Sequence, residues 1–207
     1  MNTAQDYARV GPLFVYWEAS IRFATAAAFV ILIDKLTRNL ELEIQQSRHD
    51  ALTHLPNRRA FLEAVEAQRQ RCRRYGGALS VAYIDLDDFK QLNDRQGHRT
   101  GDRALRAVAA TMLRHVRQVD LPARLGGDEF AVAYLQTSSE AALKAVTLLR
   151  DRLMEVVKKH DWPMSFSIGV ASFETMPDSV DAMISAADQL MYEVKQERKG
   201  DIRQRVL

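Results

Sequence analysis

The chain has 207 residues, of which 47% are hydrophobic and 27% charged, and its 29 Lys and Arg against 27 Asp and Glu give a net charge of +2. This composition is typical of one globular domain with a shorter additional segment, and it excludes a disordered, a collagenous and a disulfide-stabilised chain, the last because Cys72 is the only cysteine. The basic residues form no long stripe, so nucleic acid is not expected as a partner, and a bound metal would be held by carboxylates rather than by Cys and His.

The first predicted element is an apolar helix at residues 13–33, which follows a tail at residues 1–12. It contains only two charged residues, Glu18 and Arg22, and the basic residue Lys35 follows soon after it. A helix that spans a membrane needs roughly 20 apolar residues at about 1.5 Å each. The segment is therefore predicted to cross the inner membrane, with the domain that follows it on the cytoplasmic side. The alternative is an amphipathic helix that packs on a partner chain, and the protein would then be soluble in the cytoplasm.

Residues 34–49 are predicted to form a helical connector, because they contain neither Gly nor Pro. Ile33, Leu36 and Leu40 have the spacing of the a and d positions of a coiled coil. The pattern is short, so both a two-stranded coiled coil and a solvated single helix are compatible with it.

A folded domain is expected to begin at Asp50, where Pro56 and Asn57 interrupt the helix and can start the next one. Beyond this point, hydrophobic residues recur with helical or strand periods. The predicted helices lie at about residues 58–75, 89–93, 104–116, 139–159 and 180–194, and the predicted strands at residues 79–86, 119–125, 130–135 and 164–171. This order predicts one α+β domain, residues 50–207, in which helices flank a central, largely antiparallel sheet.

Asp85 stands at the end of an apolar strand and is followed by Leu86, Asp87 and Asp88. A carboxylate beside a backbone turn is a suitable ligand for Mg²⁺, which prefers oxygen ligands and keeps positions free for substrate phosphates. The alternative is a structural role, in which Asp87 or Asp88 caps the helix that follows.

A second candidate site is the sequence Gly126-Gly127-Asp128-Glu129-Phe130, which lies between two apolar runs. Two glycines allow a tight hairpin with positive φ and let a ligand approach the main chain closely. Two adjacent acids are unusual at the start of a strand, which favours a functional role over an ordinary surface turn.

A third group of polar residues, between Asn93 and Asp102, is expected to form a binding loop after the short helix that carries Lys90. Asn93 offers a donor and an acceptor, and Asp102 accepts two hydrogen bonds, so the two side chains can recognise the edge of a purine. His98 and two glycines lie in the same stretch, and Lys90 can reach a phosphate. The three groups together predict a site for a nucleoside triphosphate with Mg²⁺.

Five stretches of the chain resemble, in order and spacing, the successive signatures of the GGDEF-type diguanylate cyclases. They are DALTHLPNRR at residues 50–59, IDLDDFK at 84–90, ND at 93–94, GHRTGD at 97–102 and GGDEF at 126–130. The resemblance implies a fold related to the palm of nucleotide cyclases, preceded here by a long N-terminal helix. It also implies that a homodimer, with one GTP in each domain, condenses two GTP into cyclic di-GMP and releases two pyrophosphates.

The resemblance implies roles for individual residues as well. The carboxylates of Asp85 and Asp128 and the carbonyl group of Leu86 would bind metal, two Mg²⁺ or Mn²⁺ ions in each site. Glu129 would be a further metal ligand or the base that activates the 3′-hydroxyl group. The catalytic residues would be Glu129, Asp128 and Lys90, and the substrate-binding residues would be Asn93, His98, Asp102, Gly126, Gly127, Lys195 and Lys199.

Arg117 and Asp120 belong to the sequence RQVD, and five residues separate Asp120 from the turn at Gly126. This resembles the RxxD site of the family and implies inhibition by the product, in which Arg117 would bind phosphate or guanine and Asp120 a guanine edge. The alternative is a surface ion pair. The basic run at residues 69–74 is expected to be a solvated face of a helix.

The chain departs from the family pattern at Arg198-Lys199-Gly200, where the family usually has Gly-Arg-Asn. Lys199 keeps the positive charge of the family's Arg but cannot bind a phosphate with two parallel hydrogen bonds. Two other functions are therefore considered. In the first, the domain is a weak or inactive cyclase that serves as a module for binding GTP or cyclic di-GMP. In the second, it is a membrane-tethered dimerisation element whose nucleotide site is vestigial.

Overall fold

The computed structural model describes residues 17, 20–37 and 48–207. The chain divides into two compact units, with the boundary between residues 47 and 48. In the first unit, residues 20–37 form a helix, and its apolar side chains, such as those of Phe29 and Ile31, are exposed.

The predicted membrane span at residues 13–33 is not supported. Among the residues that the structure describes, no helix has the length and apolar character needed to cross a membrane. The helix at residues 20–37 includes residues 20–33 of the predicted span. The other residues of the predicted span, apart from Trp17, lie outside the described part of the chain.

Only part of the predicted connector at residues 34–49 is described by the structure. Residues 34–37 are helical, and residues 38–47, which include Leu40 of the heptad pattern, lie outside the described part. His49 forms an isolated antiparallel bridge with Pro56. The helix therefore does not extend to residue 49, because the chain there pairs with the loop that follows.

The second unit, residues 48–207, contains a five-stranded sheet and five helices. The elements are α2 (Arg58–Tyr75), β1 (Leu79–Asp87), α3 (Phe89–Gln96), α4 (His98–His115), β2 (Leu121–Gly126), β3 (Glu129–Leu135), α5 (Ser139–Lys159), β4 (Ser165–Phe173), α6 (Val180–Glu197) and β5 (Ile202–Val206). The strand order is β2-β3-β1-β4-β5. All neighbouring strands are antiparallel except β4 and β5, which are parallel. The predicted α+β fold with a largely antiparallel sheet is confirmed.

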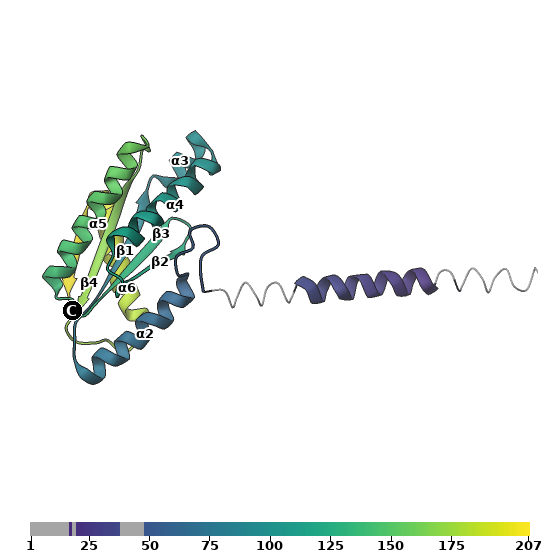
Figure 1. Cartoon of the computed structure of the whole chain (residues 1–207), viewed down its shortest axis with the longest axis horizontal. Helices are drawn as coiled ribbons and strands as arrows, with labels where there is room; N and C mark the ends of the chain where they lie inside the picture. Colours follow the sequence, from purple (N-terminus) through teal and green to yellow (C-terminus); the bar gives the residue numbers. More distant parts are fainter. Residues whose placement is uncertain (1–16, 18–19, 38–47) are drawn as a thin grey trace, which may run out of the picture. The chain divides into compact units, whose positions relative to one another are not determined.

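Helices cover both faces of this sheet (Figure 1). On one face, α4 and α5 pack against alternate strand residues such as Ile84 and Phe130. On the other face, α2 and α6 pack against residues such as Val81 and Ala133. Because successive side chains of a strand point to opposite faces, a strand in the middle of such a sheet is apolar along its length, and all of β1 is buried.

Helix α6 lies unusually close to the sheet at Gly169 of β4. A Cβ atom on Gly169 would stand 2.1 Å from the carbonyl oxygen of Ala187 and 2.2 Å from the amide nitrogen of Met191. The absence of a side chain therefore lets the backbone of α6 rest directly on β4. This packing fixes where the last turn of α6, which carries Lys195, lies relative to the sheet.

Most predicted elements lie within a few residues of the observed ones. Helix α2 begins and ends where expected, because Asn57 accepts a hydrogen bond from the amide of Ala60, and Gly76, with a φ of 77°, ends the helix. Helix α4 begins at His98 rather than at residue 104, since its first turns are polar and show no apolar period. Strand β5 was not predicted, because only one of its faces is apolar and arginines, such as Arg203, occupy the other.

Candidate active site

The candidate acidic residues meet at one end of the sheet, where β1 ends and the β2–β3 hairpin turns. Asp85 is opposite Glu129 in the pairing of β1 with β3. The amide of Leu86 donates a hydrogen bond of 3.2 Å to the carbonyl oxygen of Asp128. Asp85 is buried, whereas Asp128 and Glu129 are half-buried. The three acids therefore lie at one sheet end that is accessible from the hairpin.

The surroundings of Asp85 disfavour its charged form. Burial raises the pKa of its carboxyl group to about 6, Lys195 opposes this shift, and the charges of Asp128 and Asp87 increase it. The Nζ atom of Lys195 lies 2.6 Å from Oδ1 of Asp85. Within the described residues, however, this oxygen accepts no hydrogen bond of normal geometry. A buried carboxylate with incomplete hydrogen bonding would gain from a further cation.

Asp87 connects three segments and does not cap α3. Its carboxylate accepts hydrogen bonds of 2.7 Å from the hydroxyl groups of Ser165 and Ser167, and one of 3.1 Å from the amide of Gly200. Asp88 occupies the N-cap position of α3, with a φ of 59°, but its side chain makes no capping hydrogen bond. The capping alternative is therefore wrong for both residues. Asp87 instead anchors the start of β4 and the chain that leads into β5.

The two glycines of the hairpin have the predicted conformation. Gly126 has a φ of 155° and Gly127 a φ of 47°. No atom lies within 4 Å of the position that a Cβ atom would take on either residue. The turn thus needs glycine for its backbone angles, and it leaves open space in which a ligand can approach the main chain.

The predicted binding loop is in fact a pair of helices that meet at Gly97. Asn93 lies in α3, whereas His98, Gly101 and Asp102 lie in the first turns of α4. The helices are so close that a Cβ atom on Gly101 would stand 2.0 Å from Oδ1 of Asn93. Asn93 and Asp102 are half-buried and His98 is exposed. The prediction of a loop is wrong, but the residues expected to recognise a purine lie on neighbouring helical turns.

Three lysines that are expected to bind phosphate have different surroundings. Lys195 pairs with the buried Asp85. Lys199 is exposed, and its Nζ atom lies 2.8 Å from Oδ1 of Asp88. Lys90 is exposed on α3. Two of the three lysines are therefore already paired with acids at or directly after the end of β1.

Tyr83 is a further residue of this region that the motifs do not reveal. It lies two residues before Asp85 and therefore on the same face of β1. Its side chain is buried. Burial raises the pKa of its hydroxyl group, and interactions with Glu129 and Asp188 raise it further. The strand period, counted back from Asp85, is the signal that could have identified it.

Arg117 and Asp120 form a two-point ion pair just before β2. The Nε and Nη2 atoms of Arg117 each lie 2.7 Å from an oxygen of Asp120. Asp120 also accepts a hydrogen bond of 3.0 Å from the amide of Leu135. The side chain of Arg117 is 54% exposed and that of Asp120 only 1%. Arg117 is thus accessible to a ligand, whereas Asp120 becomes accessible only if the pair opens.

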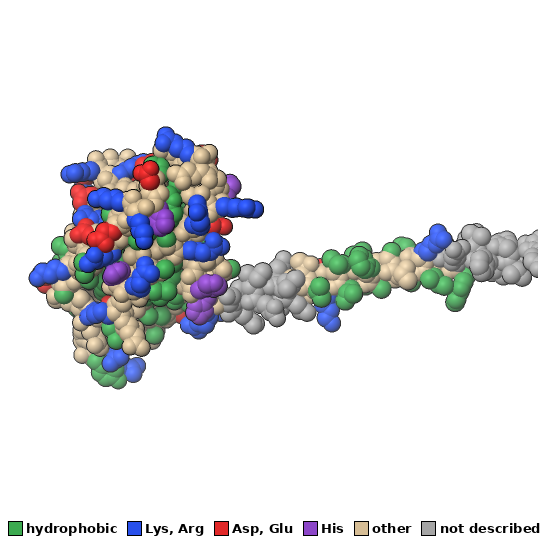
Figure 2. All heavy atoms as spheres, turned by 45° about the horizontal axis from the view of Figure 1, so that its top comes forward, with side chains coloured by type: hydrophobic (Ala, Val, Ile, Leu, Met, Phe, Trp, Pro, Cys, Tyr) green, Lys and Arg blue, Asp and Glu red, His purple; other side chains and the backbone are tan. Residues whose placement is uncertain are grey.

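The basic run at residues 69–74 is not uniformly a solvated helix face. Arg69 is buried, forms hydrogen bonds with both oxygens of Glu66, and donates a bond of 2.7 Å to the carbonyl oxygen of Pro177. It thereby links α2 to the segment before α6. Elsewhere, Lys and Arg side chains are scattered over the face of the unit that Figure 2 shows.

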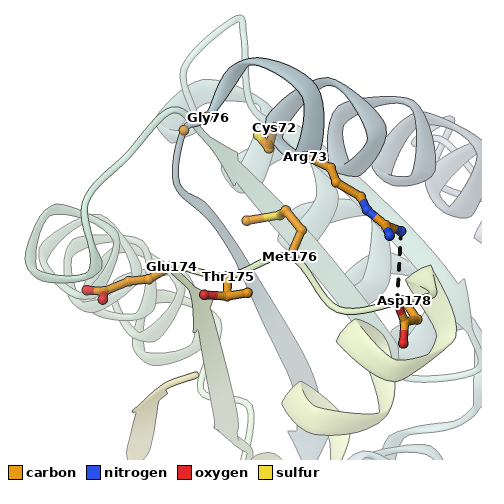
Figure 3. A pocket seen from close by; sticks show the side chains of 8 residues that line it. Cys72, Arg73, Gly76, Glu174, Thr175, Met176 and Asp178 are labelled. Carbon is orange, nitrogen blue, oxygen red and sulfur yellow. Dashed lines mark ion pairs between the residues drawn. The ribbon is translucent and has the colours of Figure 1, made fainter.

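A cavity of about 390 Å³ lies between α2 and the segment before α6 (Figure 3). Its lining includes Cys72 and Met176, and Arg73 faces Asp178 across 3.9 Å. The cavity adjoins the start of β1, whereas Asp85 is near the end of that strand. At about 3.3 Å per residue, the two places are roughly 20 Å apart. The cavity is therefore separate from the candidate site.

Residues 47–201 match the protein family described as diguanylate cyclase, GGDEF domain. The chain belongs to the GGDEF diguanylate cyclase family. Residues 126–130 are the GGDEF sequence itself, and the resemblance noted from the five stretches is confirmed.

The GGDEF domain is also similar to individual proteins of known identity. It is 36% identical over 160 residues to the diguanylate cyclase DgcP of Pseudomonas aeruginosa, and the match covers 76% of this chain and 24% of DgcP. The chain thus spans about a quarter of the length of that relative.

Two solved structures share the fold. The diguanylate cyclase SiaD of Pseudomonas aeruginosa, in complex with its activator SiaC, has a TM-score of 0.70 at 28% identity, over 97% of this chain and 80% of SiaD. The GGDEF domain of DgcB from Caulobacter crescentus, in complex with c-di-GMP, has a TM-score of 0.69 at 26% identity, over 77% of this chain and 96% of that one.

The sheet end that carries Asp85, Asp128 and Glu129 fits a divalent cation that would take some of its ligands from the substrate. In favour of a cation, Asp85 is buried with incomplete hydrogen bonding and lies close to the charge of Asp128. In the described part of the chain, no three His, Cys, Asp or Glu side chains are grouped so that they could hold a metal by themselves. Mg²⁺ is commonly bound by one or two carboxylates together with substrate phosphates, which agrees with both observations.

Proposed function

We propose that this protein is a Mg²⁺-dependent diguanylate cyclase that acts as a homodimer. It condenses two GTP into cyclic di-GMP and releases two pyrophosphates. The observation that carries the proposal is the complete set of acids, Asp85, Asp128 and Glu129, at one end of the sheet. Membership of the family supports it, because relatives such as DgcP are named diguanylate cyclases. We assign this activity to residues 50–207, and the GTP substrate implies that this domain works in the cytoplasm.

In this proposal, Asp85, Asp128 and the carbonyl group of Leu86 would hold two Mg²⁺ or Mn²⁺ ions together with the phosphates. When bound, the ions would stabilise the charge that develops on the transferred phosphoryl group and on the pyrophosphate. Lys195, which pairs with Asp85 in this structure, would bind a phosphate oxygen.

The remaining site residues bind and orient the nucleotide. Asn93 donates and accepts hydrogen bonds at the guanine edge, and Asp102 accepts them. His98 is exposed in the first turn of α4, close to Asp102 in the chain. Gly126 and Gly127 leave room for the nucleotide beside the hairpin. Lys90 and Lys199 supply positive charge for the phosphates. Phosphoryl transfer depends mainly on such positioning and charge stabilisation.

Glu129 has two compatible roles, as the base for the 3′-hydroxyl group and as a metal ligand. A Glu129→Gln variant separates them. Loss of turnover with unchanged Mn²⁺ affinity would indicate the base, whereas loss of both would indicate a ligand. Unchanged turnover would remove Glu129 from the mechanism.

The test of the activity is chromatography of the products formed by the purified chain with GTP and Mg²⁺. We expect cyclic di-GMP and pyrophosphate from the parent and neither from the Glu129→Gln variant. A domain that only binds nucleotide would instead bind GTP or cyclic di-GMP without turnover. Absence of cyclic di-GMP from a folded dimer of the parent would refute the cyclase proposal.

We also propose that cyclic di-GMP inhibits the enzyme through Arg117, with Asp120 as a second contact once the ion pair opens. Arg117→Ala should relieve inhibition, because it removes the exposed cation of this pair. The measurement is the initial rate at increasing concentrations of added cyclic di-GMP. Identical inhibition curves for parent and variant would show that the pair is only structural.

A further inference from the structure

A single guanidinium group links the beginning of the domain to the hairpin turn. The Nη1 atom of Arg124 donates a hydrogen bond of 2.8 Å to Oδ1 of Asp50. Its Nε and Nη2 atoms both donate to the carbonyl oxygen of Gly127, at 3.1 Å and 2.6 Å. The side chain of Arg124 is 11% exposed and that of Asp50 is 24% exposed. Charge-assisted hydrogen bonds with this little solvent access are stronger than those of a surface ion pair.

The loop that carries Asp50 is itself fixed in place. The same Oδ1 atom accepts hydrogen bonds from the amide of Thr53 at 2.8 Å and from its hydroxyl group at 2.6 Å. The amide of Asp50 donates to Leu55, and the amide of Arg124 donates to Pro56 at 3.0 Å. Burial alone would raise the pKa of Asp50, but the hydrogen bonds from Thr53 and Arg124 outweigh it and lower the pKa. Asp50 thus remains charged and holds one end of the guanidinium group.

The other end of the guanidinium group restrains a turn that is otherwise poorly restrained. The carbonyl group of Gly127 belongs to the peptide unit that leads into Asp128, so fixing this oxygen fixes the plane from which Asp128 begins. Adjacent glycines have many accessible backbone conformations. The pairing of β2 with β3 is also irregular between Arg124 and Gly126. Arg124 therefore restrains the backbone at the turn, where the chain itself restrains it least.

We infer that Arg124 is a positioning residue, which holds the Gly126-Gly127 turn in its active conformation, and that Asp50 in turn positions Arg124. The inference rests on the proposed cyclase activity and adds a route of control to it. Asp50 lies next to the bridge between His49 and Pro56, where the preceding segment joins the domain. A movement of that segment would be transmitted to Asp128 through the side chains of Asp50 and Arg124.

The test uses the whole chain with three substitutions, Arg124→Met, Arg124→Lys and Asp50→Asn. A misplacement of about 1 Å can reduce turnover about 100-fold, so Arg124→Met should lower kcat about 10- to 100-fold. Arg124→Lys should lower it less, because it keeps the charge near Asp50 but has a single donor group. Combining Asp50→Asn with Arg124→Met should reduce kcat no further than Arg124→Met alone, since both act through the same contact.

The matched control is Arg152→Met, which removes an arginine from an exposed ion pair with Glu155 on α5. It should leave kcat unchanged. A folded Arg124→Met variant with the kcat of the parent would overturn the inference. So would equal losses in the Arg124 and Arg152 variants, or fully additive effects of Asp50→Asn and Arg124→Met.

Amide hydrogen exchange at residues 126–129 provides a readout that does not depend on turnover. We expect faster exchange there in Arg124→Lys and Asp50→Asn, with no change in α5, and these two milder variants decide the matter if Arg124→Met does not fold. If the parent makes no cyclic di-GMP but exchange at the turn still rises, the proposed function fails while the positioning role stands. Unchanged exchange would overturn the positioning role whatever the activity.

Discussion

Replacement of Gly101 by Ala should impair recognition of GTP while leaving the fold intact. The new Cβ atom would stand 2.0 Å from Oδ1 and 2.9 Å from Cγ of Asn93, and 3.1 Å from Cζ of Phe89. A carbon and an oxygen atom need about 3.3 Å between them, so Oδ1 of Asn93 would have to move by roughly 1.3 Å. The amide is the end of a side chain that can rotate, and it would therefore turn away from the position in which it is proposed to bind guanine.

The expected magnitudes differ between recognition and stability. A hydrogen bond between neutral groups contributes about 0.5–1.5 kcal/mol, so the loss of both amide contacts should raise KM for GTP about 5- to 150-fold. Ala is favoured over Gly within a helix by about 1 kcal/mol, which offsets the cost of moving the amide. The free energy of unfolding should therefore change by less than about 1 kcal/mol.

The assay is the initial rate of cyclic di-GMP formation as a function of GTP concentration, with urea unfolding of the same samples. The controls are Asn93→Ala and the double variant. The double variant should have the KM of Asn93→Ala alone, because both substitutions act through one amide. A folded Gly101→Ala variant with the KM of the parent would refute this reasoning.

Gly169→Ala should destabilise the fold by about 3 kcal/mol or more. The new methyl group would stand 2.1 Å from the carbonyl oxygen of Ala187, and this backbone atom of α6 cannot rotate away as a side chain can. Urea unfolding measures the change in the free energy of unfolding, and a loss below about 1 kcal/mol would contradict the prediction. Glu66→Gln should lower the Tm at pH 7 and make the Tm depend less on pH in acid. Hydrogen bonds from Arg69 lower the pKa of Glu66 from 4.5 to about 2, so the stabilisation by the charged carboxylate is lost as the pH falls through this range. Parallel profiles of Tm against pH for parent and variant would contradict this. Asp85 has a pKa raised from 3.8 to about 6, mainly by burial, so without metal the parent should lose stability as the pH rises between these values, whereas Asp85→Asn should not. Calorimetry at pH 7 should also show that Mg²⁺ with GTP raises the Tm of the parent but not of Asp85→Asn, and an equal rise would remove this carboxylate from the metal site.

The elements that could be predicted from the sequence are those with strong local signals. Helix α2 has a capping residue, Asn57, an apolar stripe and a terminal glycine, and its ends lie where predicted. The GGDEF hairpin has two glycines between apolar strands, and both glycines adopt positive φ. The acids at Asp85 and at residues 128–129 were also identifiable, because acidic residues are unexpected where apolar strands begin or end.

The errors arose where contacts with other elements, rather than the local pattern, decide the structure. The start of α4 looked like a loop, because its first turns are polar and their packing depends on Gly101 against Asn93 of α3. Strand β5 carries little apolar signal of its own and is formed by pairing with β4. Arg69 resembled a solvated residue, yet contacts with the segment before α6 bury it.

The sequence by itself determined the family, the class of fold and the groups of candidate site residues, because these follow from hydrophobic period, turn residues and motif spacing. Only the tertiary structure decided the partners of those residues. It paired Lys195 with Asp85, turned Asp87 toward β4 and the chain before β5, and placed Arg124 between Asp50 and the hairpin. The physical reason is that burial and charge pairing depend on which distant segments the fold brings together, and neither can be deduced from neighbours along the chain.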